Sequence, residues 1–101
     1  MVSEKPFEKR LLDLIPCGAE NAVTAKELAT LMNCHIRIIT ASIHFLRCTG
    51  AVICADTNGF YKPGNLEETR HFVNSMHSRV KHIRAAAASA EKLLERGGGY
   101  E

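Results

Sequence analysis

The spacing of apolar residues predicts where helices begin and end along this chain. The first apolar series has helical spacing and consists of Phe7, Leu11, Leu12, Leu14 and Ile15. It predicts a helix over residues 6–15, which ends at Pro16 because proline cannot continue a helix interior. Residues 16–22, with the sequence PCGAENA, interrupt the pattern and predict a loop.

Two further helices are predicted, joined by a short turn. Thr24 followed by Glu27 is a capping-box pattern, so a second helix is expected over residues 25–32. Its inner face consists of Ala25, Leu28, Ala29 and Met32. The residues NCH (33–35) break the pattern, and the third helix, residues 35–48, has Ile39, Ile43 and Leu46 at core spacing. Two helices separated by a three-residue turn form a helix-turn-helix unit.

A β-hairpin is predicted after the third helix, which Gly50 ends. Residues 51–55, AVICA, are rich in strand-forming side chains, and FYK returns after Asn58-Gly59. Asn-Gly between two apolar runs is the strongest short-range signal for a tight hairpin turn. Since a lone hairpin is not stable in water, we expect Ile53 and Phe60 to hold it against the helices.

The last part of the chain has a heptad pattern. Its apolar seam consists of Leu66, Val73, Met76, Val80, Ile83, Ala87, Ala90 and Leu94. From Val73 onward the steps alternate between three and four residues, which is typical of a coiled coil. The pattern predicts a long helix over residues 65–96, followed by a flexible tail over residues 97–101 that begins with GGG.

Two interpretations of this seam are open. Its first half, from Val73 to Val80, fits an ordinary amphipathic helix folded back on the rest of the domain. Its second half extends too far for so small a domain to cover, and its alanines allow two helices to approach closely. We therefore favour a homodimer whose interface residues are Val73, Met76, Val80, Ile83, Ala87, Ala90 and Leu94. Parallel and antiparallel pairing both remain open.

Composition limits the classes of protein to which this chain can belong. The 101 residues suffice for one domain with an appendage, and the formal net charge of +2 neither requires nor excludes a nucleic-acid partner. Four cysteines lack zinc or redox spacing. We find no signal-peptide pattern and no stretch long enough to span a membrane. These features predict a cytoplasmic protein with reduced thiols.

The predicted order of three helices and a hairpin is the winged-helix arrangement, in an α+β, mostly helical fold. The segment KELATLMNCHIRIITASIHFLRCTGAVICADTNGFYKPG resembles the winged helix-turn-helix domain of biotin-repressor-type bacterial regulators and of small bacterial and prophage proteins. The resemblance rests on Leu28-Ala29, the Ile39/Ile43/Leu46 core, Gly50 and NGFYKP, and it covers roughly residues 7–64. It implies a domain over residues 1–64 that binds double-stranded DNA and regulates transcription.

Groove geometry then indicates which residues would contact DNA. The major groove admits one α-helix, and the preceding helix braces it across the backbone. Arg37 can bridge a guanine, Thr40 can contact a thymine methyl group or a phosphate, and His44 and Arg47 can contact the backbone. The full set of predicted DNA-binding residues is Thr24, Lys26, His35, Arg37, Thr40, Ala41, His44, Arg47, Asn58 and Lys62.

Two features of the third helix support a different interpretation. His35 stands where such turns usually have serine, and histidine is a poorer helix cap. Ile36 and Ile38 are unexpectedly apolar for a helix that faces a groove, and they can face DNA, the core or a partner. The alternative function is therefore a winged-helix protein-interaction or assembly module without strong DNA binding.

Other kinds of chemistry receive little support from the sequence. His71, His77 and His82 do not share one helical face, so we expect no metal site there. Cys48 and Cys54 are expected in the core. A redox or metal sensor would need an exposed thiol near a histidine. We find no nucleophile set and no phosphate-binding glycine loop, and we therefore expect no enzymatic activity, cofactor or small-molecule ligand.

Overall fold

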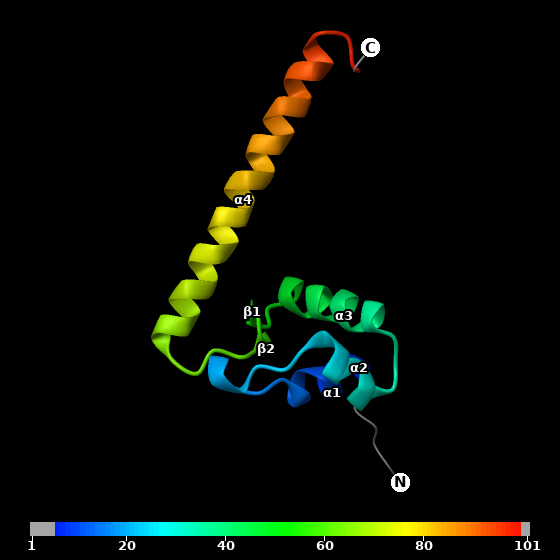
Figure 1. The fold of residues 1–101 in the computed structure, drawn as a ribbon, viewed down its shortest axis with the longest axis vertical. Helices are drawn as coiled ribbons and strands as arrows, with labels where there is room; N and C mark the ends of the chain where they lie inside the picture. Colours follow the sequence, from blue (N-terminus) through cyan, green and yellow to red (C-terminus); the bar gives the residue numbers. More distant parts are fainter. Residues whose placement is uncertain (1–5, 100–101) are drawn as a thin grey trace. The chain divides into compact units, whose positions relative to one another are not determined.

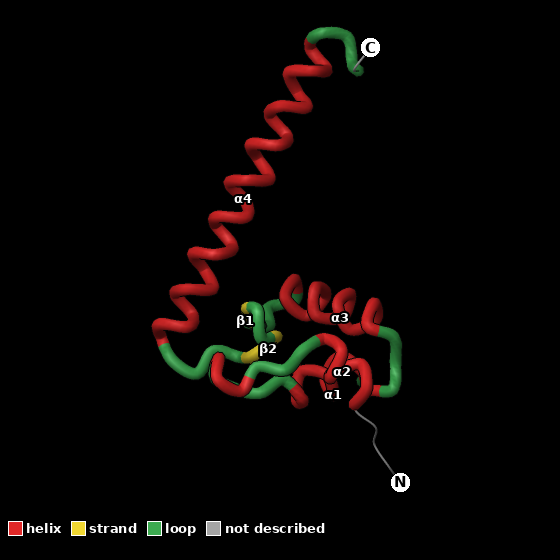
Figure 2. The backbone as a smooth tube through the Cα atoms, viewed as in Figure 1, coloured by secondary structure: helices red, strands yellow, loops and turns green. Residues whose placement is uncertain are grey.

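The structure is a computed structural model of the chain, in which residues 6–99 are described. It is mostly helical with one two-stranded antiparallel hairpin, in agreement with the predicted α+β class (Figures 1 and 2). Contacts divide the chain into two units, Met1–Thr69 and Arg70–Glu101. The elements are α1 (Phe7–Leu14), the 3-10 turn η1 (Ala19–Asn21), α2 (Ala25–Met32), α3 (Ile36–Cys48), β1 (Cys54–Asp56), β2 (Gly59–Tyr61) and α4 (Leu66–Glu95).

The core of the first unit lies between α1, α2 and α3. Its fully buried side chains are aliphatic except for Cys54, and the aliphatic ones include Leu11, Ile15, Leu28, Ile39, Ile43 and Ile53. The predicted inner face of α2 is confirmed, because Leu28 and Ala29 are buried and Ala25 and Met32 pack against the core. Ile15 is extended, as expected for a residue that precedes proline, and α1 ends at Leu14.

The turn between α2 and α3 is built from three residues with distinct roles. Asn33 has a left-handed backbone (φ 55°), and the Cys34 amide donates to the Ala29 carbonyl at 3.0 Å. His35 then caps α3, because its Nδ1 accepts a hydrogen bond from the Arg37 amide at 3.1 Å. The imidazole thus takes the place of the hydroxyl that usually caps such a helix, and α3 begins at Ile36, one residue after the predicted start.

The hairpin turn differs by one residue from the prediction. Strand pairing joins Cys54 to Tyr61 and Asp56 to Gly59, so Thr57 and Asn58 form the loop. Asn58-Gly59 is therefore not the central pair. The turn closes at Asp56, whose Oδ1 accepts a hydrogen bond from the Asn58 amide at 2.8 Å. The first strand begins at Cys54 rather than within residues 51–53.

A second line of backbone pairing supports the hairpin. Phe60 and Val23 exchange backbone hydrogen bonds of 2.6 and 3.0 Å, which joins the outer edge of β2 to the residue before the Thr24 cap of α2. Ile53 is fully buried and Phe60 packs against the core. Both anchoring residues are thus confirmed.

The long helix α4 begins with a network of side-chain hydrogen bonds. Asn65 Oδ1 accepts from the Glu68 amide at 2.8 Å, and the Glu68 carboxylate accepts from Gly64 (2.8 Å) and Ala19 (3.1 Å) amides. These bonds attach the first turn of α4 to the first unit, so the division falls after Thr69 rather than after residue 64. The helix has 30 residues and ends before Gly97, where the backbone turns with φ 115°. Residues 100 and 101 of the predicted tail, and residues 1–5, lie outside the described residues.

Candidate nucleic-acid interface

One face of α3 carries four of the ten side chains predicted to contact DNA. Its opposite face is buried and consists of Ile39, Ser42, Ile43 and Leu46. The residues that project away from this core are all exposed and are Arg37, Thr40, Ala41 and His44. Thr40 Oγ1 donates to the Arg37 carbonyl at 3.1 Å, which holds the threonine methyl group in a fixed position. The structure therefore brings these four residues together on one solvent-facing surface.

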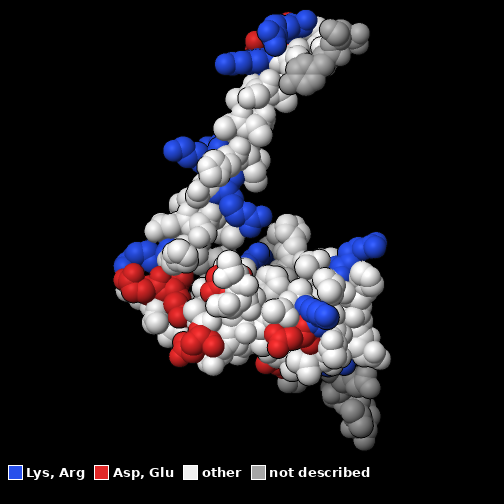
Figure 3. Space-filling view, in the orientation of Figure 1, with Lys and Arg blue, Asp and Glu red and all other residues white. Residues whose placement is uncertain are grey.

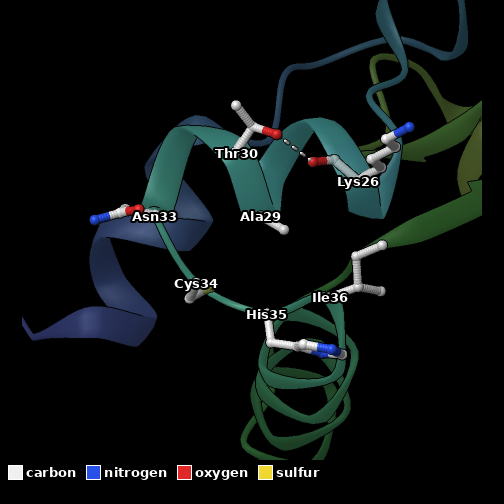
Figure 4. A pocket seen from close by; sticks show the side chains of 7 residues that line it. All are labelled: Lys26, Ala29, Thr30, Asn33, Cys34, His35 and Ile36. Atoms are coloured by element: carbon white, nitrogen blue, oxygen red, sulfur yellow. Dashed lines mark hydrogen bonds between the residues drawn. The ribbon is translucent and has the colours of Figure 1, made fainter.

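A hollow lies beside the start of this surface, where α2 meets α3. It measures about 460 Å³ and is lined by Lys26, Ala29, Thr30, Asn33, Cys34, His35 and Ile36. Figure 4 shows Lys26 and Asn33 toward opposite ends of α2, with His35 and Ile36 opening α3 on the other side. Thr30 Oγ1 donates to the Lys26 carbonyl at 3.1 Å. Lys26 supplies the one Lys or Arg side chain among these lining residues, and the exposed His35 lies across the hollow from α2.

Thr24 has a structural role at the start of α2. Its side chain accepts from the Glu27 amide at 3.0 Å, and Glu27 Oε1 accepts from the Thr24 amide at 2.8 Å, which confirms the predicted capping box. The hydrogen bonds from the Thr24 backbone and side chain hold the pKa of Glu27 below its ordinary value. A carboxylate at this end of α2 repels a phosphate, so we leave Thr24 out of the proposed DNA contacts.

Arg47 also has a structural role that the sequence did not suggest. Its side chain is half-buried, and Nε donates to the Ile53 carbonyl at 2.9 Å. This bond joins the last turn of α3 to the segment that leads into β1. The guanidinium group is therefore engaged inside the protein, and we leave Arg47 out of the proposed DNA contacts.

The hairpin contributes two more of the predicted residues. Asn58 is exposed at the tip, although its backbone amide is used in the turn. The backbone of Lys62 pairs with the loop after α1: its amide donates to Pro16 (2.7 Å) and its carbonyl accepts from Gly18 (2.8 Å). These bonds fix the position of Lys62, whose side chain is half-buried. The hairpin thus presents one cation and one amide.

Exposed apolar side chains flank the polar surface of α3. Ile36 and Ile38 are 43% and 48% exposed, so neither belongs to the core. Sequence reasoning missed Phe45, which is 55% exposed and stands seven residues after Ile38 on the same flank. The available sequence signal was the seven-residue spacing between Ile38 and Phe45, which places both side chains on the same side of a helix. This flank is a candidate surface for a protein partner.

The cysteines differ from the prediction in one respect. Cys54 is buried as expected, whereas Cys48 is exposed, with its Sγ 3.7 Å from His44 Nε2. Burial, reinforced by the Glu68 carboxylate, raises the pKa of the Cys54 thiol. Among the described residues, no three histidine, cysteine or acidic side chains come together as a possible metal site. The exposed Cys48 beside His44 is the thiol–histidine pair that a redox sensor would need.

Charge is distributed unevenly along the sequence. From Arg70 to Ala90 the chain contains no acidic residue, and its cations are Arg70, Arg79, Lys81 and Arg84. Figure 3 shows Lys and Arg side chains at intervals along the long helix, whereas most of the Asp and Glu side chains in view lie on the first unit. The middle of α4 is therefore basic, whereas Glu67 and Glu68 at its start and Glu91 and Glu95 near its end leave the whole helix nearly neutral.

Comparison with known proteins identifies no relative. No protein-family model, curated protein or solved structure gives a significant match to this chain. Within residues 6–99, no helix combines the length and apolar character that crossing a bilayer requires.

Proposed function

We propose that this protein is a winged-helix DNA-binding protein that acts as a homodimer, with α3 as the helix that enters the major groove. The observation that carries the proposal is the exposed surface of Arg37, Thr40, Ala41 and His44, set on a helix whose other face is buried. A rigidly packed helix with one polar, solvent-facing side suits base-edge contacts. A small transcriptional or phage-type regulator is the class that fits such a unit.

The contacts divide into two kinds. Arg37 can donate two hydrogen bonds to a guanine, and Thr40 and Ala41 are small enough to approach a thymine methyl group. Five further residues contact the sugar-phosphate backbone of the DNA and thereby position the helix: Lys26, His35, His44, Asn58 and Lys62. Because one copy offers few cations, two copies joined through α4 would provide the affinity that a specific site requires.

Replacing both central side chains tests this assignment. Arg37→Ala combined with Thr40→Ala should lower affinity for a selected duplex by at least about tenfold, as expected for a lost bidentate base contact. Lys9→Ala removes an exposed cation from α1 and is the matched control, with little expected effect. Fluorescence anisotropy measures both. Undiminished binding by the double variant would refute the role of α3.

The second candidate function is a protein-interaction module. Ile36, Ile38 and Phe45 support it, because together they give α3 exposed apolar flanks. Titration of a random duplex at low salt separates the two functions. Binding that weakens steeply as salt rises favours DNA, and the absence of such binding favours a protein partner.

A further inference from the structure

We infer that α4 pairs with α4 of a second copy in antiparallel orientation, with Val73 facing Ala90 of the partner subunit. This inference rests on the proposed homodimer and adds its orientation and register. The layers of the seam would be Thr69 with Leu94, Val73 with Ala90, Met76 with Ala87, and Val80 with Ile83, each repeated by the twofold axis.

The first argument is that the seam needs a cover. No residue of α4 from Leu66 to Glu95 is buried. The large seam side chains are strongly exposed: Val73 42%, Val80 45%, Ile83 64% and Leu94 69%. A heptad repeat places these side chains along one stripe, and the surface that matches such a stripe best is another helix with the same repeat.

The second argument concerns side-chain size. The first half of the seam has Val73, Met76, Val80 and Ile83, and the second half has Ala87 and Ala90 before Leu94. Parallel pairing would place the large residues of the first half together and would leave two successive layers in which alanine faces alanine. Antiparallel pairing leaves no layer of two alanines, because Ala87 and Ala90 face Met76 and Val73 of the partner subunit.

The third argument is charge. The positions that flank the seam are Arg70, His77, Arg84 and Glu91 on one side, and Phe72, Arg79, Ala86 and Leu93 on the other. In a parallel pair, Arg79 would face Arg84 of the partner subunit on both sides of the interface. In the antiparallel register, Arg70 faces Glu91 of the partner subunit instead, and Arg84 faces His77 rather than an arginine.

The opposite flank fits the same register. Phe72 and Leu93 are both half-buried already in the single chain, and the register sets them against each other across the interface. Arg79 then meets only Ala86 of the partner subunit. The paired length from Thr69 to Leu94 is about 39 Å at 1.5 Å per residue. One orientation thus satisfies the apolar, the steric and the electrostatic pattern together.

Cysteine cross-linking in the full chain tests the orientation. Cys17 and Cys48, the two exposed thiols, are first changed to serine to give a background chain. Val73→Cys and Ala90→Cys are then made separately. Under mild oxidation, we expect neither variant alone to form a disulfide-linked dimer, whereas a mixture of the two does.

The outcomes separate this inference from the proposed function. Cross-linking of each variant with itself would overturn the antiparallel register and leave the dimer intact. A background chain that sediments as a monomer at high micromolar concentration would overturn both the register and the proposed dimer. DNA binding by α3 is measured independently with the Arg37 and Thr40 variants.

A charge exchange provides a second test that needs no cysteine. Arg70→Glu or Glu91→Arg alone should raise the dissociation constant of the dimer about tenfold, because each change creates two like-charge pairs. The double variant Arg70→Glu/Glu91→Arg should return the dissociation constant of the dimer to that of the wild type. Glu95→Arg, which lies away from the seam flank, is the matched control. Failure of the double variant to recover would contradict the register.

Discussion

Gly59 lies so close to the Val23 carbonyl that a Cβ on Gly59 would overlap it. This contact explains why a single hairpin persists in a helical protein. The hydrogen bonds between Phe60 and Val23 extend the hairpin onto the residue that precedes the α2 cap. The hairpin and the start of α2 are therefore held together by backbone rather than by side chains alone.

Gly59→Ala should destabilise the first unit. Its φ of 129° is unfavourable for an L-residue, at a cost on the order of 1–3 kcal/mol, and overlap with Val23 adds to that cost. Gly50→Ala is the control, because Gly50 also has a positive φ of 112° but has no atom within 4 Å of its would-be Cβ. Urea denaturation measures both. Equal losses of unfolding free energy would show that the approach to Val23 is unimportant.

The capping box at α2 predicts a pH dependence. Since the pKa of Glu27 is lowered in the folded protein, its carboxylate stabilises the fold at neutral pH. That contribution is lost as pH falls from about 5 toward 3 and the carboxylate is protonated. Glu27→Gln keeps an acceptor but not the charge, so its stability should approach that of the wild type over this range. Urea denaturation at each pH measures both proteins. A difference in unfolding free energy between them that stays constant with pH would contradict this role of Glu27.

Thr24→Ala tests the other half of the capping box. Loss of the hydroxyl leaves the Glu27 amide without its acceptor and should cost about 1 kcal/mol of unfolding free energy. Thr24→Ser retains the hydroxyl and should be close to neutral. Because the hydroxyl is engaged in the cap, DNA affinity of the folded variant should change little. A large loss of affinity with stability unchanged would return Thr24 to the DNA contacts.

Arg47 and Arg37 should respond differently to truncation. Arg47→Ala removes the hydrogen bond to Ile53 and should lower unfolding free energy by about 1–2 kcal/mol. Arg37→Ala, at an exposed position, should leave stability nearly unchanged and weaken binding to a selected site. Thermal denaturation and anisotropy on both proteins give the comparison. An Arg47→Ala protein of normal stability would refute the structural role.

Thiol labelling checks the environment of each cysteine. Cys17 and Cys48 are exposed and should react readily with iodoacetamide in the native protein. Cys54 is buried and its pKa is raised, so it should react only when the first unit unfolds. Mass spectrometry of digested protein identifies the modified sites. Rapid labelling of Cys54 would contradict the packing around β1.

Local signals predicted most of the helical structure. The capping box and apolar spacing gave α2 its observed bounds, and the proline after Ile15 and the glycines after α4 placed two helix ends. These signals act within a few residues. The outward face of α3 followed from the same periodicity, since the burial of Ile39, Ile43 and Leu46 determines which side chains remain exposed.

Features that depend on distant contacts could not be predicted in this way. The hairpin turn lies one residue before the predicted Asn58-Gly59 pair. The pairing of β2 with Val23, which is far away in sequence, also has no local signal. The hydrogen bond from Arg47 to Ile53 has no sequence signature. Helix-cap propensity likewise did not indicate that a ring nitrogen of His35 accepts a hydrogen bond from the Arg37 amide. Each of these features arose where one residue had more than one possible partner.

The most direct test of DNA recognition by a dimer is selection of bound sequences from a random duplex pool with the full chain. The proposal predicts enrichment of an inverted repeat, because a twofold dimer presents two copies of α3 to two half-sites. Arg37→Ala in the same selection should relax the preference at one position of each half-site. A pool that shows no enriched sequence after repeated rounds would contradict the proposal.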